Sequence, residues 1–189
     1  MALPAEKARY TFADALAWGE DERIEIIDGE AVMMAPPLRV HQEILMALSR
    51  QIANLLDGKQ CKVYPAPFAV RPFEEDGDAP EDVDTMLEPD ITVVCDPDKL
   101  DKYGCKGAPD LVIEILSPST RRHDMAVKYR LYQRAGVREY WIVDPDGKTV
   151  QVFKLEDGFY GAADVYTAGA VPVSLWEDFS IDLSRVFTE

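Results

Sequence analysis

The sequence is poor in cysteine and has no long apolar run. Its three cysteines, Cys61, Cys95 and Cys105, are an odd number and form no Cys-x-x-Cys pair. This pattern disfavours a disulfide framework or a zinc site, and it predicts free thiols in a reducing cytoplasm. No segment approaches the roughly 18–20 apolar residues of a membrane-spanning helix, and the N-terminus has no apolar signal-peptide core. We therefore expect a cytoplasmic protein with no membrane partner.

Basic residues are scarce as well. The 189 residues include 20 Lys and Arg against 35 Asp and Glu, and the net charge of −15 argues against a protein that coats nucleic acid. The charge is uneven, because residues 117–138 contain six basic residues and one acid, a local net charge of +5. Such a basic segment can still bind phosphate groups. Residues 74–90 contain nine acids and no base, and we interpret them as a solvated loop.

The apolar pattern predicts an α/β fold. With 47% hydrophobic and 29% charged residues, a chain of this length can bury one sizeable core. Apolar periodicity predicts helices that begin at Thr11 and span residues 39–57, and strands over residues 23–27, 31–34, 61–70, 91–95, 150–154 and 161–166. We expect a mixed β-sheet flanked by helices, with extra strands at both ends of the chain.

Residues 107–144 form the unit around which the other elements are expected to assemble. They predict an apolar strand, a turn, an amphipathic helix that ends at Gly136, and a second apolar strand that can lie parallel to the first. One acid, Glu114, interrupts the first strand between Ile113 and Ile115. An unpaired carboxylate in a buried strand costs roughly several kcal/mol. Glu114 is therefore expected to have a cation, a metal ion or a hydrogen-bond network as its partner.

Asp90 is the acid expected to lie beside Glu114. It follows Pro89 at the start of a different buried strand, and pairing of the two strands can bring the carboxylates together. Asp110 shares the strand of Glu114, but four residues at about 3.3 Å each place it roughly 13 Å away, which is too far to share a metal ion. We interpret Asp110 as a strand-entry residue that can accept a hydrogen bond.

Lys128 is the base expected to meet these acids. It shares a helical stripe with Leu131, Tyr132 and Ala135, so its ammonium group is expected to point to the sheet. Tyr132 is interpreted as a core residue. A buried ion pair between Lys128 and Glu114, with no catalytic role, is the alternative that this pattern leaves open.

The order of Pro89-Asp90, Glu114 on the next strand, a helix and a further strand resembles the PD-(D/E)XK nuclease superfamily. Residues 107–144 resemble, more specifically, the Uma family of restriction-endonuclease-like proteins, which is catalogued as a domain of unknown function. One position departs from the superfamily pattern, which has a lysine two residues after the acid. Here that position is Leu116.

The resemblance is close over residues 88–155 and looser over residues 10–185. It implies a single restriction-endonuclease-like domain over residues 1–189, with a core at about 39–155. It also implies hydrolysis of DNA phosphodiester bonds with Mg²⁺, or Mn²⁺, as the cofactor.

The resemblance further implies a set of site residues. In some branches of the superfamily the basic residue has moved to the adjacent helix, and Lys128 fits that description. The implied metal ligands are Asp90, Glu114 and the backbone carbonyl of Ile115, a set of oxygen atoms that suits Mg²⁺. An acid on the first helix often assists, and Glu43 is the available candidate. Two arginines of the basic segment are candidates for phosphate binding: Arg121 and Arg122.

Two functions stay open at this point. The favoured one is a Mg²⁺-dependent endonuclease whose binding to DNA is weak and sensitive to salt. The alternative is a catalytically inactive nuclease-fold scaffold or binding module, and a homodimer is an assembly that the sequence leaves open. The net charge of −15 and the missing strand lysine favour the scaffold, whereas the pair of Asp90 and Glu114 favours the enzyme.

Overall fold

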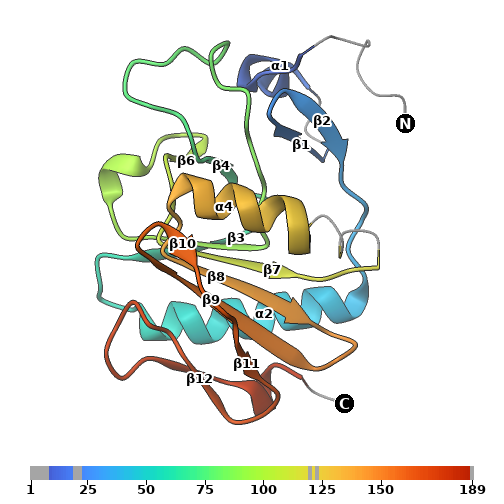
Figure 1. The fold of residues 1–189 in the computed structure, drawn as a ribbon, viewed down its shortest axis with the longest axis vertical. Coiled ribbons are helices and arrows are strands. Elements are labelled where there is room, and N and C mark those ends of the chain that lie inside the picture. The colour runs from blue at the N-terminus through green and yellow to red at the C-terminus, as the bar shows by residue number, and fades with distance from the viewer. Residues whose placement is uncertain (1–8, 19–22, 119–120, 122–123, 188–189) are drawn as a thin grey trace.

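A seven-stranded mixed sheet forms the centre of the fold (Figure 1). The computed structural model describes residues 9–18, 23–118, 121 and 124–187. The strands follow one another in the order β10 (Phe159–Tyr160), β9 (Thr149–Glu156), β8 (Glu139–Asp144), β7 (Leu111–Ile115), β5 (Ile91–Val94) and β3 (Lys62–Pro65), and β11 (Asp164–Tyr166) pairs with β9.

The central crossover has the predicted form. Strands β7 and β8 are parallel, and the chain between them includes the π-helical turn η2 (Asp124–Lys128) and helix α4 (Tyr129–Ala135). The other pairs of this sheet are antiparallel, so the prediction of a mixed sheet is confirmed. Helix α4 ends at Gly136, whose backbone has the left-handed conformation (φ 88°) that glycine adopts without a steric penalty.

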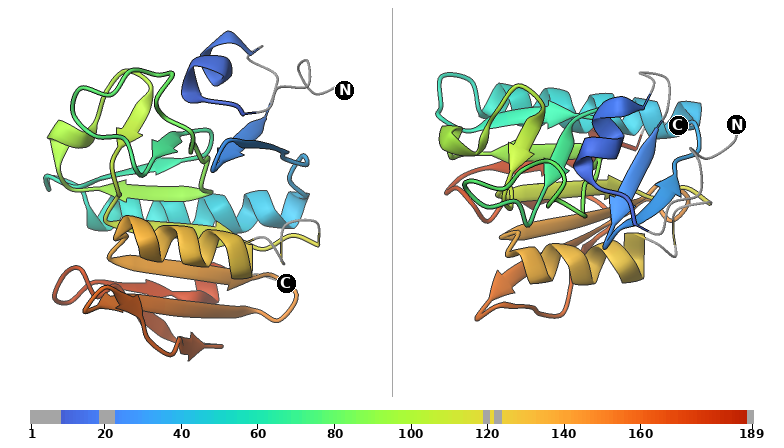
Figure 2. Two further views of the ribbon diagram at one scale, coloured as in Figure 1. Left: turned by 45° about the horizontal axis from the view of Figure 1, so that its top comes forward. Right: turned by 90° about the horizontal axis from the view of Figure 1, so that it is seen from above.

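Helices cover both faces of the sheet (Figure 2). Helix α2 (Arg39–Leu55) packs its apolar stripe on one face, and α4 packs on the other. Side chains alternate between the faces along each strand. On β7, Ile113 and Ile115 belong to the core on the α2 side, whereas Val112 belongs to the core on the α4 side. The alternation places Glu114 on the α4 side.

The N-terminal part adds a helix and a hairpin to the α4 side of the sheet. Helix α1 (Phe12–Ala17) precedes strands β1 (Ile24–Ile27) and β2 (Glu30–Met33), which form an antiparallel hairpin. Ile26 of β1 is fully buried and forms a bridge with Met86. The hairpin is thereby attached to the segment that leads into β5.

The C-terminal part covers the α2 side. Strands β12 (Ala170–Pro172) and β13 (Ser180–Asp182) pair with each other and are followed by the short helix η3 (Leu183–Arg185). Val171 and Ile181 are buried in the same core cluster as the apolar residues of α2. The prediction of extra strands at both ends of the chain is therefore confirmed.

The predicted strand over residues 61–70 is divided in two. A cis peptide bond between Ala66 and Pro67 separates β3 from β4 (Ala69–Arg71), which pairs in parallel with β6 (Gly104–Lys106) after the short helix η1 (Pro97–Lys99). Gly104 has a φ of 151°, and a Cβ atom there would lie 2.0 Å from the carbonyl oxygen of Ala69. Only glycine allows the two strands to approach this closely.

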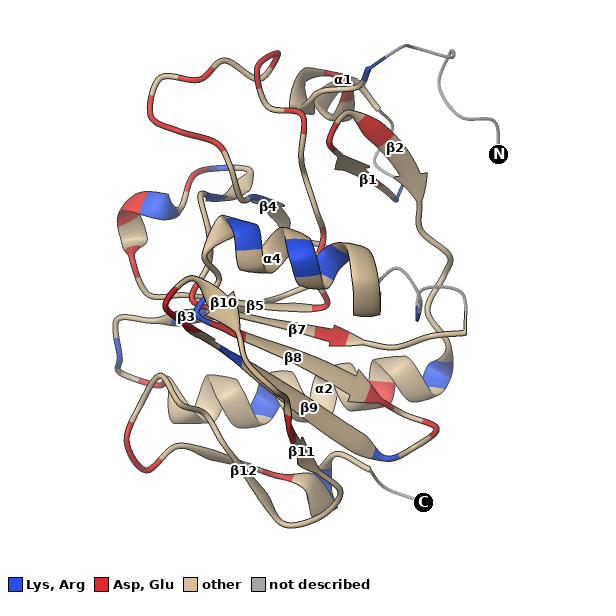
Figure 3. Cartoon of the chain, viewed as in Figure 1, with Lys and Arg blue, Asp and Glu red and all other residues tan. Residues whose placement is uncertain are grey.

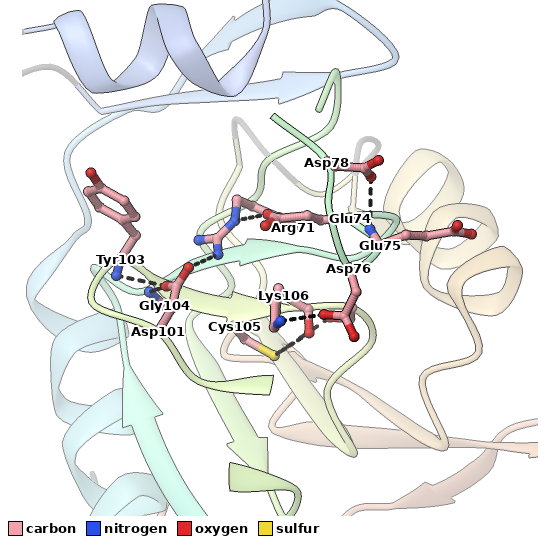
Figure 4. Close-up of polar contacts among 11 residues, drawn as sticks. Arg71, Glu74, Glu75, Asp76, Asp78, Asp101, Tyr103, Gly104, Cys105 and Lys106 are labelled. Atoms are coloured by element: carbon pink, nitrogen blue, oxygen red, sulfur yellow. Dashed lines mark hydrogen bonds and ion pairs between the residues drawn. The ribbon is translucent and has the colours of Figure 1, made fainter. Parts of the chain in front are cut away.

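A buried arginine fixes the start of the acidic loop that joins β4 to β5. The fully buried side chain of Arg71 pairs with Glu74 and donates a hydrogen bond to Asp101 at 2.6 Å (Figure 4). Its guanidinium lies 4.6 Å from the ring centroid of Phe12. The first part of the loop is solvated, as predicted, but Leu87 near its end is fully buried. Buried residues near both ends of the loop therefore fix the chain that leads to Asp90 and β5.

Two of the three cysteines form a disulfide. Cys61 and Cys95 flank the paired ends of β3 and β5 and are bonded to each other, whereas Cys105 is free and buried. The prediction of free thiols is therefore wrong for two of them, because it did not include the strand register. Since disulfides are rare in cytoplasmic proteins, the cysteines do not support the predicted location. Within the described ranges, no helix combines the length and apolarity needed to span a membrane.

Candidate active site

Strands β5 and β7 bring Asp90 and Glu114 together. Ile91 pairs with Ile113 in the antiparallel register, so one further step places Asp90 opposite Glu114. Residues directly opposite each other share one face, with Cβ atoms about 4.5–5.5 Å apart. Both acids line one cavity of about 290 Å³, to which Ile115 also contributes. The candidate ligands that the sequence suggested thus lie around a common space.

The carboxylate of Asp90 is held from two sides. Its Oδ2 accepts a hydrogen bond from the backbone N–H of Ile115 at 2.7 Å, and Nε2 of His41 lies 3.1 Å from the same oxygen. Asp90 is 9% exposed and His41 is 8% exposed. The described residues donate no hydrogen bond to Oδ1 of Asp90. One carboxylate oxygen is therefore fixed, and the other is available to a ligand.

Lys128 lies between two buried acids. Its Nζ is 2.8 Å from Oε1 of Glu25 and 3.0 Å from Oε1 of Glu114, and the three side chains are 3–4% exposed. The hydroxyl of Tyr132 donates a hydrogen bond to the same oxygen of Glu114 at 2.7 Å. Burial, together with the negative charges of Glu114 and Glu25, raises the pKa of Tyr132 well above its usual value. Tyr132 therefore stays protonated and acts as a donor at neutral pH.

Elements far apart in the sequence place these side chains. Lys128 is the last residue of the π-helical turn η2, and such turns are frequent at functional sites. Glu25 lies in the middle of β1, 103 residues before Lys128. Its Oε1 also accepts a hydrogen bond from the backbone N–H of Glu88 at 3.0 Å. The N-terminal hairpin thus contributes a charged group that contacts Lys128, which lines the cavity.

Sequence reasoning missed Glu25 and His41 as members of this cluster, although each has a signal. Glu25 interrupts a short apolar strand in the same way as Glu114 does. His41 precedes Ile44 and Leu48 by three and seven residues, so it falls on the buried stripe of α2. Either pattern identifies a polar group that needs a partner inside the protein.

Two other predicted site residues, Glu43 and Arg121, do not line the cavity. Glu43 is half exposed and pairs with Arg39 on the outer surface of α2. Arg121 donates two hydrogen bonds to Asp144, at 3.0 and 2.8 Å, and this contact lowers the pKa of Asp144. Arg122 lies outside the described residues. A phosphate would have to compete with Asp144 for Arg121.

Ion pairs also offset much of the charge of the basic segment. Figure 3 shows basic residues along α4 and acidic residues in the loops around it. Arg134 pairs with Asp28 at 2.8 Å, and Arg138 pairs with Asp110 at 3.2 Å. Asp110 also accepts a hydrogen bond from the backbone N–H of Cys95, as predicted for this strand-entry residue. The segment is therefore a weaker attractant for phosphate than its net charge of +5 suggests.

The oxygen atoms around the cavity fit a hard divalent cation. Mg²⁺ is commonly bound through one or two carboxylates and retains several waters. Asp90 offers its Oδ1, Glu114 and Ile115 line the same cavity, and the cavity of about 290 Å³ has room for water. Among the residues described, no group of three or more His, Cys, Asp or Glu side chains is arranged as a metal centre. An ion here would depend on the backbone carbonyl and on water as additional ligands.

Comparisons with known proteins give a consistent result. Residues 11–184 match the family model Uma2, described as "Putative restriction endonuclease". A Synechocystis sp. PCC 6803 protein, "Uncharacterized protein slr1290", is 29% identical over 147 residues, which cover 76% of this chain and 73% of that protein. The crystal structure of "a putative nuclease belonging to DUF820" from Anabaena variabilis ATCC 29413 matches with a TM-score of 0.74 and 21% identity, over 94% of this chain and 97% of that one. The match confirms the predicted fold class.

Proposed function

The chain belongs to the Uma2 family, and we propose that it is a nuclease that hydrolyses phosphodiester bonds in DNA with a divalent metal ion. The observation that carries this proposal is the meeting of Asp90, Glu114 and Lys128 at one cavity. Two carboxylates and one ammonium group are the residue types that the PD-(D/E)XK superfamily uses. The proposed cellular location is the cytoplasm, where such a substrate is found.

The proposed metal ligands are Asp90, Glu114 and the carbonyl oxygen of Ile115. When bound, Mg²⁺ or Mn²⁺ lowers the pKa of a coordinated water and neutralises charge on the scissile phosphate. The protein contributes the orientation of the ligands. The N–H of Ile115 and the ring of His41 hold Asp90, and the hydroxyl of Tyr132 holds Glu114.

Lys128 contributes a fixed positive charge to the proposed reaction. Its ammonium lies 3.0 Å from Glu114 and lines the same cavity, so it can stabilise negative charge that develops on the phosphoryl oxygens. Such stabilisation is stronger in a buried site than in water because the local dielectric constant is lower. Glu25 accepts a second hydrogen bond from this ammonium, at 2.8 Å, and helps to hold it in place.

One observation favours a second candidate function, a catalytically inactive scaffold. Lys128 already pairs with both Glu25 and Glu114, so the buried acids have a partner without a metal ion. In this alternative the cavity binds a partner and performs no chemistry. The two candidates differ in whether Asp90 and Glu114 bind a divalent ion.

Two measurements test the proposal. The first is a titration of the protein with Mn²⁺, monitored by calorimetry, and the second is the nicking of supercoiled plasmid DNA. We expect the wild type to bind one Mn²⁺ and to nick the plasmid, and EDTA to stop the reaction. Asp90→Asn and Glu114→Gln should lose both properties. Glu43→Gln is the matched control, because it neutralises an acid of α2 that lies outside the cavity.

The control also tests the predicted assistance by Glu43, since a loss of activity in Glu43→Gln would restore that role. The proposal of a nuclease is rejected if the wild type neither binds Mn²⁺ nor nicks DNA. In that case the inactive scaffold becomes the better account of the buried ion network.

A further inference from the structure

Two hollows meet at Asp90. The first is the cavity of about 290 Å³ that contains Glu114 and Lys128, and the second, of about 320 Å³, extends past Glu88 to Pro67. Four residues line both hollows: Arg23, Pro37, His41 and Asp90. Asp90 therefore lies at the boundary between two spaces, and a ligand centred on it can extend in both directions.

The size and the walls of the hollows suit nucleosides. Cavities of about 300 Å³ are at the lower end of those that hold a small organic molecule. The segment before α2 gives the first hollow an apolar wall that includes Pro36 and Leu38, and the second hollow has Leu45, Ala66 and Pro67. Apolar walls favour contact with the faces of bases and sugars, because such contact removes apolar surface from water.

The surroundings of the site suit a paired duplex poorly. Asp90 and Glu114 are 9% and 3% exposed, so a phosphate must enter the cavity to reach them. Binding to duplex DNA depends mainly on many contacts between basic side chains and phosphates. Within the described part of the chain, Arg23 and Lys128 are the Lys and Arg residues that line the hollows, and Lys128 is engaged by two acids. Arg23 is a third exposed and forms an ion pair with Glu88 at 3.6 Å.

We infer that the substrate of this site is an unpaired nucleic-acid strand, with its scissile phosphate at Asp90 and one nucleoside in each hollow. The inference rests on the proposed nuclease function and names the class of its substrate. Arg23 lies where the two hollows meet and supplies positive charge for the phosphate. A strand with free bases can fill both hollows, whereas the bases of a duplex are occupied by pairing and stacking.

Binding without catalysis is the first test. A short fluorescein-labelled DNA strand, alone or annealed to its complement, is titrated with the protein in EDTA, and fluorescence anisotropy is measured. We expect the single strand to bind at least about tenfold more tightly than the duplex, since base contacts add to the phosphate contacts. Equal or tighter binding of the duplex, or no binding of either DNA, overturns the inference.

A variant at the apolar wall shows whether binding occurs in the hollow. Leu38 lines the first hollow, is 56% exposed and is the N-cap residue of α2. Because serine is a preferred N-cap residue, Leu38→Ser should fold at least as well as the wild type while it removes apolar surface. We expect about a fivefold loss of affinity for the single strand and no change for the duplex. Met46→Ser, at an exposed position of α2 outside both hollows, is the matched control.

Cleavage of the same strand and duplex with Mn²⁺ separates the inference from the proposed function. Preferential cleavage of the single strand supports both. Preferential cleavage of the duplex supports the nuclease and overturns the inference. If neither DNA is cut but the single strand binds in a manner that depends on Leu38, the nuclease proposal fails and the assignment of the hollows to an unpaired strand stands.

Discussion

Replacement of Lys128 by methionine should strongly destabilise the protein. Each of its contacts, at 2.8 and 3.0 Å, contributes about 6 kcal/mol of attraction at an effective dielectric constant of about 20. The desolvation of three ions opposes this attraction and costs several kcal/mol for each ion, so the net value of the cluster is small. Lys128→Met, however, leaves Glu25 and Glu114 buried without the ammonium that pairs with both of them. We expect a loss of about 3–5 kcal/mol in the free energy of unfolding.

Urea denaturation followed by the fluorescence of tryptophan, including the buried Trp141, measures this loss. Arg130→Met is the matched control, because Arg130 is an exposed cation of the adjoining helix and its loss should change stability by less than about 0.5 kcal/mol.

A triple variant tests the physical reason for the loss. Lys128→Met combined with Glu25→Gln and Glu114→Gln removes all three charges, and it should regain most of the lost stability, to within about 1 kcal/mol of the wild type. A loss below about 1 kcal/mol in the single variant would refute the reasoning. So would a triple variant that is as unstable as the single one, because the penalty would then come from lost packing and not from charge.

Three further outcomes are expected. Tyr132→Phe should lower the free energy of unfolding by about 1.5–3 kcal/mol, measured in the same urea assay, because its hydroxyl donates to the charged Glu114. Arg121 lowers the pKa of Asp144 from 3.8, so the stabilisation by this pair is present above that value and is lost as the pH falls below it. The difference in stability between the wild type and Asp144→Asn should therefore shrink between about pH 5 and pH 2. Burial raises the pKa of Cys105 to about 12, so a thiol reagent at about pH 8 should leave it unlabelled in the folded protein.

Local sequence patterns were sufficient to predict the helix and strands of the central unit, residues 107–144. The two apolar runs of residues 107–144 predicted β7 and β8, and Gly136 predicted the end of α4. The match of residues 11–184 confirms the resemblance to the Uma family. The position of Asp90 opposite Glu114 was predicted from the expected pairing of their two strands and from the alternation of side chains along each strand. These inferences succeed because strand and helix periodicities act over a few residues.

Contacts between segments far apart in the sequence could not be predicted from such local patterns. The parallel pairing of β4 with β6 has no local signal, and β6 is only three residues long. The disulfide between Cys61 and Cys95 depends on the register of β3 and β5, which the sequence does not specify over 34 residues of separation. The contact between Glu25 and Lys128 likewise arises from the docking of a hairpin. Tertiary packing fixes each of these contacts.

The position of Leu116 explains why the cation comes from the helix. In the superfamily pattern a lysine stands two residues after the acid, but here Leu116 is 3% exposed and belongs to the apolar core beneath α4, together with Leu131. A lysine at that position would displace packed apolar surface. The π-helical turn η2 instead carries Lys128 to the face of Glu114, where the three N–H donors of the buried ammonium need more than one acceptor. Glu25 supplies the second carboxylate, so the N-terminal hairpin and the relocated lysine form one structural solution.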